Sequence, residues 1–382
     1  MLTKTLPAGA LAPLPIKRVD AICVRLPLAK PVRMAGVHLH HSDNLLVRIE
    51  SASGVTGWGE STAAPSHGGA TLSDMARTIE RDVQALLLGQ DAIGLSAHTA
   101  RLALSKGKAD SAIAAVDLAL YDLVGKHLGL SAHVLLGGLR RSSIAPLWLV
   151  GTASTEEDVA EAERSYRQGY RFFKLKLAVK SLGEDIASTR ALRQRFGPEV
   201  RLCADANEGL SLDGALAYVR AVADCGLEFL EQPTAKGDVE GLRQLCAASA
   251  IPIGLDEAVG GTGDLLRLAP TGIGGAALKT LKLGGLSGVL AAGTVCEALG
   301  LRINLSGKIA ETSIGSAALL QLGGVLPGVD WGVSPSHLYL GEDVVASPLQ
   351  PVDGAYAVPC LPGLGIVVDE ARVARLRIQP GS

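Results

Sequence analysis

The sequence predicts an α/β protein whose main part is a closed (β/α) barrel of seven or eight units, beside a smaller α+β domain. From about residue 144 to 340, short apolar segments alternate with amphipathic stretches, a pattern typical of parallel strands joined by helices. Residues 16–140 differ, because three strand-like segments there precede several helical ones. The chain of 382 residues is long for one domain and suits a large domain with a smaller one.

The chain divides into four parts. Residues 1–15 have a short apolar stretch broken by three prolines, so we expect a disordered lead-in and no signal peptide. We assign residues 16–140 to the α+β domain and residues 141–345 to the barrel. Residues 346–382 form a tail with a strand-like sequence, and we expect this tail to pack back on the N-terminal domain. In the α+β domain we predict strands at 17–29, 44–50 and 54–60 and a helix at 108–128.

The barrel strands are predicted from short apolar runs that recur at about the length of one β/α unit. This rhythm favours a TIM-type barrel, with a doubly wound open sheet as the rival arrangement. The candidate strands are 145–150, 171–177, 201–206, 227–231, 252–256, 276–282 and 301–305.

Composition argues against several classes of protein. The net charge of -2 and the aromatic content of 3% give no support to a nucleic-acid-binding role. No apolar run reaches the roughly 18–20 residues of a membrane-spanning helix. The six cysteines are scattered without a CxxC pair, so reduced thiols and a cytoplasmic location are expected.

Two lysines interrupt the otherwise apolar segment RFFKLKL at 171–177. Because side chains alternate along a strand, Lys174 and Lys176 share one face, and the apolar residues between and beside them take the other. The apolar face suits contact with helices. We therefore expect the lysines to look into the barrel at its C-terminal mouth, where barrel active sites lie. The alternative is a solvated edge strand with outward lysines.

Three consecutive barrel strands each end in a carboxylate: Asp205, Glu231 and Asp256. The spacings of 26 and 25 residues correspond to about one β/α unit each. Converging carboxylates repel one another unless a cation neutralises them. Oxygen ligands favour a hard ion, so the sequence predicts Mg²⁺ first and Mn²⁺ second. The alternative is three ordinary strand-end acids that cap the following helices.

Lys279 follows on a later strand, where we expect it across the mouth from Lys176. A divalent ion between two lysines suits removal of the proton α to a carboxylate, because the cation stabilises the enediolate charge as it develops. The base must be a neutral amine, so we expect the ammonium of Lys174 to lower the pKa of Lys176. Lys282 cannot share the face of Lys279 in a regular strand, and we expect it to face solvent or to lie behind the site.

With these residues, the sequence resembles the muconate lactonizing enzyme subgroup of the enolase superfamily, in the mandelate racemase/muconate lactonizing enzyme family. The resemblance covers nearly the whole chain after residue 16. It implies that Lys176 and Lys279 are the acid/base pair, that the three carboxylates hold Mg²⁺, that the N-terminal domain and tail cap the mouth, and that the protein is a homo-oligomer. It is carried by KLK (174–176), Asp205, EQP (231–233), DE (256–257), LKTLKLGG (278–285), GWGE (57–60), AVDLALYDLVGKHLG (115–129), LLGG (135–138), AETSIG (310–315) and GLGIVVDE.

The resemblance also implies substrate-binding residues. It places Asn207 beside the metal, and His38 and His67 in two substrate-facing loops, 33–41 and 64–69.

Three further residues near the last strands are candidates for binding substrate. Ser306 is one of them. Lys308 stands where a neutral residue is expected, and it would bind a second anionic group or a carbonyl if it points inward; the alternative is a surface lysine. Ser334 stands where cycloisomerases of muconate carry an acid, and Ser334 and Ser336 replace the Asp-x-Asp of dipeptide epimerases. Both of those activities therefore lose support.

These observations favour a Mg²⁺-dependent isomerase acting on a small-molecule carboxylate. Racemisation or epimerisation of an N-substituted or cyclic amino acid fits two opposed lysines best, and cycloisomerisation of a muconate-like diacid is second. A dehydratase of a β-hydroxy imino acid such as a hydroxyproline would use the same enediolate. A catalytically silent barrel that acts as a binding protein is the alternative of another class.

Overall fold

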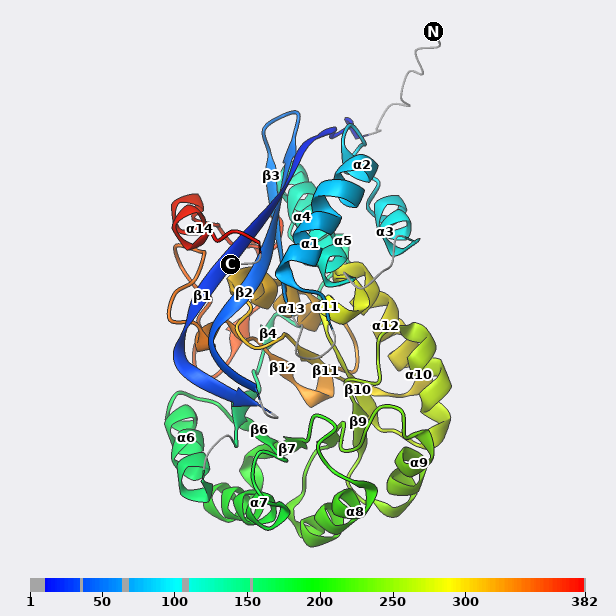
Figure 1. Cartoon of the computed structure of the whole chain (residues 1–382), viewed down its shortest axis with the longest axis vertical. Coiled ribbons are helices and arrows are strands. Elements are labelled where there is room, and N and C mark those ends of the chain that lie inside the picture. Colours follow the sequence, from blue (N-terminus) through cyan, green and yellow to red (C-terminus); the bar gives the residue numbers. More distant parts are fainter. Residues whose placement is uncertain (1–10, 35–36, 64–68, 105–109, 152–153, 381–382) are drawn as a thin grey trace.

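The computed structural model describes residues 11–34, 37–63, 69–104, 110–151 and 154–380. In Figure 1 the barrel occupies the lower half of the molecule, and the N-terminal helices lie above it. The long hairpin of β1 and β2 runs down beside the barrel. This arrangement places one end of the N-terminal domain next to the barrel.

The barrel is an eight-stranded parallel sheet in the order β5 to β12, as the sequence predicts. A parallel bridge between Pro146 and Val333 joins its two edges, and the amide of Leu147 donates to the carbonyl oxygen of Val333 at 2.8 Å. The strands are β5 (Trp148–Val150), β6 (Phe172–Lys176), β7 (Arg201–Asp205), β8 (Leu230–Glu231), β9 (Ile253–Leu255), β10 (Gly275–Leu278), β11 (Arg302–Ser306) and β12 (Val333–Ser334).

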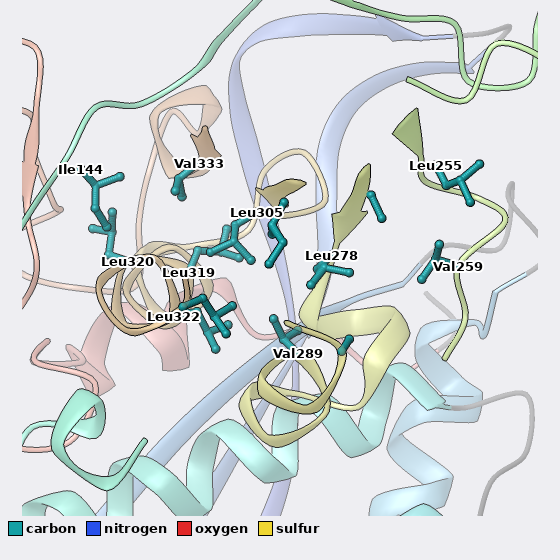
Figure 2. Packing of buried hydrophobic residues seen from close by; sticks show 14 of the residues in the cluster. Ile144, Leu255, Val259, Leu278, Val289, Leu305, Leu319, Leu320, Leu322 and Val333 are labelled. Carbon is teal, nitrogen blue, oxygen red and sulfur yellow. The ribbon is translucent and has the colours of Figure 1, made fainter. Parts of the chain in front are cut away.

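Helices follow the barrel strands and cover the outside of the sheet (Figure 1). They are α6 (Thr155–Arg167), α7 (Leu182–Phe196), α8 (Leu212–Ala221), α9 (Val239–Ala248), α10 (Thr262–Leu268), α11 (Thr280–Leu283), α12 (Leu286–Leu299) and α13 (Ser313–Val325). Figure 2 shows the contact between the two layers. Leu278 of β10 and Leu305 of β11 lie beside Val289 of α12 and Leu319 of α13, all within one buried cluster.

Two of the strand assignments differ from the structure. The predicted strand 276–282 is wrong in its second half, because β10 ends at Leu278 and the chain turns into α11 at Thr280. Strand β12 was not among the predicted strands. It has only two residues and follows Gly332, whose φ is 85°, so no apolar alternation marks it.

An aromatic floor fills the N-terminal half of the barrel. The rings of Trp331 and Phe229 stack with centroids 4.2 Å apart, in a cluster with Leu147, Phe172 and Cys203. A Cβ on Gly275 would lie 2.6 Å from the Trp331 ring, so a glycine is needed beside the indole. The floor closes the barrel below its C-terminal mouth.

The N-terminal domain is an antiparallel sheet of β1 (Ile16–Met34), β2 (Val37–Ser51) and β3 (Thr56–Thr62), with helices on one side. Strand β3 lies directly on α4 (Asp110–Leu128). A Cβ on Gly59 would stand 1.9 Å from the carbonyl oxygen of Ala115, which explains the glycines in GWGE. The other helices are α1 (Leu72–Thr78), a π-helical turn (Ile79–Val83), α2 (Gln84–Leu87), α3 (Leu95–Leu104) and α5 (Ala132–Leu135).

The predicted loop 33–41 is mostly strand in the structure. Pairing between Val32 and Leu39 and between Pro27 and His41 continues the β1–β2 ladder past the predicted ends of both strands. Cross-strand hydrogen bonding extends these strands despite the polar residues of β2, which gave no alternating signal.

Both ends of the described chain pack against the N-terminal sheet. Leu14 is buried and its amide donates to Asp91 Oδ1 at 2.9 Å, so the expected disordered lead-in of 1–15 ends before this residue; residues 1–10 lie outside the described part. At the other end, α14 (Glu370–Leu376) lies beside β1, and the amide of Ile378 donates to the carbonyl oxygen of Cys23 at 2.9 Å. The short strands β4 (Ser143–Ile144) and β13 (Tyr356–Ala357) pair with each other.

None of the helices in the described ranges combines the length and the hydropathy that crossing a bilayer requires.

Buried Glu60, at the end of GWGE, joins the two domains. Its carboxylate accepts hydrogen bonds from the amide of Thr312 at 2.8 Å, the hydroxyl of Thr312 at 2.6 Å and the amide of Gly315 at 2.9 Å. These amides belong to the first turn of α13, whose N-terminus has no intrahelical partners for them. Asn44 of β2 donates to the same carboxylate at 2.6 Å. Glu60 therefore caps a barrel helix from the N-terminal domain.

We predict that Glu60→Gln lowers the free energy of unfolding by about 2–4 kcal/mol, because the amide group of glutamine would turn a donor toward buried donors. Chemical denaturation measures the change. Glu163→Gln, which removes a surface pair with Arg195, is the control and should cost less than about 0.5 kcal/mol. Equal stability of the two variants would show that the cap does not hold the domains together.

Candidate active site

The barrel mouth contains a cavity of about 540 Å³. Most of its walls come from the C-terminal ends of the barrel strands, and Gly69, Ala70 and Ser111 contribute from the N-terminal domain. Ten of the predicted site residues line it: Lys174, Lys176, Lys279, Asp205, Glu231, Asp256, Asn207, Ser306, Lys308 and Ser334. The other two, His67 and the side chain of His38, lie outside the described residues.

Strand β6 carries Lys174 and Lys176 into this cavity. The two side chains are buried, at 2% and 8% exposure, while Phe173 and Leu175 point outward into the cluster beneath the helices. The period-two alternation of the strand thus separates the charged face from the apolar face. The solvated edge strand does not occur.

The three carboxylates stand on neighbouring strands at the same height. Asp205 is the register partner of Lys176 on one side and of Glu231 on the other. Asp256 comes directly after β9, and its amide donates to the side-chain oxygen of Gln232 at 2.9 Å. All three carboxylates are 1–2% exposed.

Each carboxylate is paired with a lysine from an adjacent strand or from the next strand but one. Lys176 Nζ lies 2.5 Å from Asp205 Oδ2, Lys174 Nζ lies 2.5 Å from Glu231 Oε2, and Lys279 Nζ lies 2.6 Å from Asp256 Oδ2. Because unpaired buried charges are strongly destabilising, these pairs hold the ends of five adjacent strands in register.

Burial and neighbouring charges set the protonation of these groups. Burial opposes the charge on Lys174, but Glu231 and Asp205 outweigh it and hold the pKa of Lys174 above its ordinary value. The pKa of Lys279 is raised in the same way, against burial, by Asp256 and its neighbours. Burial, together with the negative charges of Asp205 and Asp256, raises the pKa of Glu231 to about 7 despite Lys174. The three carboxylates therefore repel one another.

The carboxylates fit a divalent ion by their chemistry. They offer hard oxygen donors from three adjacent strand ends, and their mutual repulsion would be relieved by positive charge. Within the described part of the chain, no three acidic, histidine or thiol side chains converge on one point as a ready-made metal site. The ion pairs explain this, because a carboxylate oxygen of each acid is turned toward an ammonium. An entering cation would have to displace the lysines.

Lys174 and Lys176 share the inward face of β6, as expected, but their ammonium groups contact different partners. Lys174 pairs with Glu231 and donates to Asn304 Oδ1 at 3.2 Å. Lys176 contacts Asp205 and Asn207 Oδ1, the latter at 2.7 Å. The expected effect of Lys174 on the pKa of Lys176 stays a prediction.

Because the chain turns into α11 after β10, Lys282 does not have the position that a continuous strand would give it. The turn brings this ammonium back over the site, 2.6 Å from Asp256 Oδ1, rather than out to solvent. A helical turn, unlike a strand, places residues three apart on the same face.

Sequence reasoning also gave no role to Gln232 and Asn304. Gln232 lies in EQP, and its side-chain oxygen accepts from the amides of Asp256 and Ala258, so it fixes the strand end that carries Asp256. Asn304 donates to the carbonyl oxygen of Trp331 at 2.8 Å and accepts from Lys174. The sequence did contain a signal for Asn304, because it is a polar amide inside an apolar strand segment. A buried polar group requires hydrogen-bond partners, so such a residue is expected to hold neighbouring groups in place.

The predicted substrate-binding residues occupy different parts of the wall. Asn207 has a φ of 43°, and it donates to Glu257 Oε1 at 3.0 Å. Ser306 donates to Asn304. Ser334, its register partner on β12, has a buried hydroxyl that makes no hydrogen bond with any described residue. Lys308 reaches across the cavity, and its ammonium donates to the carbonyl oxygen of Ala63 in the N-terminal domain.

Glu311 lies behind Lys308, and it is 2% exposed. Its Oε1 accepts from the amide of Lys308 at 3.1 Å, while its Oε2 makes no hydrogen bond among the described residues. Burial and the nearby charge of Glu60 raise the pKa of Glu311 to about 8. This raised pKa favours the protonated, neutral form of the side chain at pH 7.

Comparisons with known proteins agree with this geometry. Residues 17–137 match the family model described as "Mandelate racemase / muconate lactonizing enzyme, N-terminal domain", and residues 157–372 match "Enolase C-terminal domain-like".

Among curated proteins, the chain is 31% identical to muconate cycloisomerase 1 of Pseudomonas putida, covering 94% of this chain and 98% of that protein. It is 30% identical to L-Ala-D/L-Glu epimerase of Bacillus subtilis, covering 92% and 96%. Among solved structures, muconate lactonizing enzyme from Pseudomonas fluorescens complexed with muconolactone aligns with a TM-score of 0.92 and 30% identity, covering 96% of this chain and 100% of that one. The names of these relatives give no support to the dehydratase alternative.

We predict that Glu311→Gln removes a pH dependence of stability. The folded-state pKa of about 8 lies above the ordinary value of 4.5, so the protonated form stabilises the fold. This stabilisation is complete below about pH 4.5 and is lost as the pH rises through 8. The Tm of the glutamine variant should therefore rise relative to that of the native chain between pH 5 and pH 9. A constant difference in Tm would show that Glu311 is ionised in the fold.

Proposed function

The chain belongs to the mandelate racemase/muconate lactonizing enzyme family of the enolase superfamily, and on that premise we propose that it is a Mg²⁺-dependent racemase or epimerase of a carboxylate substrate. The reaction would remove the proton α to the carboxylate and return a proton to the same carbon. N-substituted and cyclic amino acids are the substrate class that we favour. Family membership makes the chain an enzyme rather than a silent binding protein.

The order of the strands carries this proposal. Lys176 ends β6 and Lys279 follows β10, while the three carboxylates end the strands between them, β7, β8 and β9. Two amines therefore approach one small cavity from opposite sides of an acidic cluster. A racemase needs this placement, since one group must take the proton from one face and another must supply it to the other face.

The residues proposed to hold the metal are Asp205, Glu231 and Asp256. When bound there, Mg²⁺ would supply positive charge beside the substrate carboxylate and stabilise the negative charge that develops on it. Gln232 would keep Asp256 in place through its two backbone hydrogen bonds. Lys282, on the other oxygen of Asp256, would restrict its rotation.

The chain's own residues would move the proton. Lys176 Nζ, held between Asp205 and Asn207, would accept the α-proton as a neutral amine, and Lys279 Nζ would donate a proton to the opposite face. In the reverse direction the roles exchange. Lys174, through its ion pair, would favour the ionised form of Glu231 and would lie toward the substrate carboxylate. The aromatic floor closes the site from below and excludes water from that side.

Cycloisomerisation of a muconate-like diacid is the second candidate. The high similarity to proteins named as muconate cycloisomerases favours it. Against it, Ser334 occupies the wall position where an acid is expected in cycloisomerases acting on muconate, and a hydroxyl is a poor proton donor. We also propose that residues 16–140 and the tail 346–382 form the cap over the barrel domain 141–345.

Proton NMR in D₂O with Mg²⁺ tests the proposal. We expect loss of the α-proton signal from both enantiomers of at least one N-acyl or cyclic amino acid. Lys176→Met and Lys279→Met should each slow exchange about 10²–10⁴-fold, each with a different enantiomer, because each lysine serves one face. Lys17→Met, on an exposed surface pair, is the control. Lactone signals from muconate would favour the cycloisomerase, and loss of exchange with the same enantiomer in both variants would overturn the two-base arrangement.

A thermal-shift measurement tests the metal. Mg²⁺ at about 100 times its Kd should stabilise the native chain by about 2.7 kcal/mol, seen as a rise in Tm. Asp256→Asn should abolish that rise. Asp330→Asn, an exposed acid at the other end of the barrel, should leave it unchanged. A rise that persists in Asp256→Asn would place the metal elsewhere.

A further inference from the structure

The charges that line the cavity do not balance. Six lysines and four carboxylates line it, an excess of two positive charges when all ten groups are ionised and before any metal ion binds. The lysines are Lys174, Lys176, Lys236, Lys279, Lys282 and Lys308, and the acids are Asp205, Glu231, Asp256 and Glu257. A cavity with this excess favours a substrate with more than one negative charge.

Two of the six lysines stand apart from the ion pairs. The other four ammonium groups are within 2.6 Å of a carboxylate oxygen, and two of these four, Lys279 and Lys282, share Asp256. Lys236 is exposed at the rim, where water solvates its charge. Lys308 is half-buried, and among the described residues it has no carboxylate partner. Its ammonium donates to the carbonyl oxygen of Ala63. This hydrogen bond uses one of the three N–H donors of the ammonium, and the carbonyl oxygen carries no formal charge that could neutralise it.

Two carboxyl groups interact with the charge of Lys308, those of Glu311 and Asp43. Burial and Glu60 raise the pKa of Glu311 to about 8, which favours its neutral form at pH 7. Asp43 is occupied by Arg25, which donates to both of its oxygens at 2.7 and 2.9 Å. Burial accordingly lowers the pKa of Lys308, in spite of these two acids.

The backbone around Lys308 is held in place from three sides. Glu311 Oε1 accepts a hydrogen bond from the amide of Lys308, and the hydroxyl of Ser336 donates to the carbonyl oxygen of Lys308 at 2.7 Å. Asn44 of β2 donates to the carbonyl oxygen of Ala310 at 3.1 Å, and Ala310 itself has a φ of 66°. A charged group on such a fixed, strained loop is typical of a preorganised binding residue.

We propose that Lys308 forms an anion subsite, at the junction of barrel and N-terminal domain, that binds a second carboxylate of the substrate. The substrate is then a dicarboxylate: one carboxylate lies at the acid/base lysines and the other at Lys308. The inference rests on the proposed function, because that function assigns the first carboxylate to the other end of the cavity.

Matched ligands test the subsite by binding alone. Calorimetry of the Mg²⁺-loaded protein would compare succinate, glutarate and adipate with their monoamides, which replace one carboxylate by a neutral amide of the same shape. We expect at least one diacid to bind about 10- to 100-fold more tightly than its monoamide. Lys308→Met should remove most of this ratio and leave the affinity for the monoamide unchanged, while Lys308→Arg should retain part of it.

Lys236→Met is the control, because it removes a positive charge from the rim without touching the proposed subsite. It should keep the ratio. A ratio near one for every diacid, no binding of any diacid, or a ratio that survives Lys308→Met in a variant with native Tm would overturn the proposal.

The α-proton exchange measurement separates this inference from the proposed function. A diacid preference that depends on Lys308, without exchange of any substrate, would keep the subsite and reject the isomerase. Exchange with equal efficiency for N-acetyl and N-succinyl amino acids would keep the isomerase and reject the subsite.

Discussion

Opposite charges buried side by side at the barrel mouth are the constraint on which the rest of the structure depends. Lysines and carboxylates on five adjacent strands pair at 2.5–2.6 Å, and removing one member would leave its partner buried and unpaired. The aromatic floor of Trp331 and Phe229 limits the cavity to the level of these pairs. The lysines and carboxylates that hold the mouth together are also the groups proposed to transfer the proton and to bind the metal.

The junction between the domains carries a second set of buried polar contacts. Glu60 caps α13 from the N-terminal sheet, and Lys308 reaches back from the barrel to the carbonyl oxygen of Ala63. The first contact fixes the N-terminal domain against the barrel, because a helix terminus has few alternative partners once water is excluded. The second lies in the wall of the cavity itself. A residue proposed to bind substrate therefore also joins the two domains.

Much of the site follows from two periodicities. Alternation by two turned Lys174 and Lys176 inward, and the length of one β/α unit brought Asp205, Glu231 and Asp256 to one edge. The errors arose where a short element broke the period. Strand β10 stops before Thr280, so Lys282 returns to the site through a helical turn. The pairing of Lys174 with Glu231 was not predicted either, because pairing between β6 and β8 depends on distances between strands that are far apart in sequence.

The sequence by itself determined the barrel, the inward face of the strand that carries Lys174 and Lys176, and the three strand-end carboxylates, because these follow from local alternation and regular spacing. Only the tertiary structure decided which lysine pairs with which carboxylate, that Gln232 and Asn304 hold the site in place, and that Lys308 is left without a counter-charge among the described residues. The physical reason is that electrostatic pairing depends on three-dimensional proximity and on burial, and neither has a period along the chain.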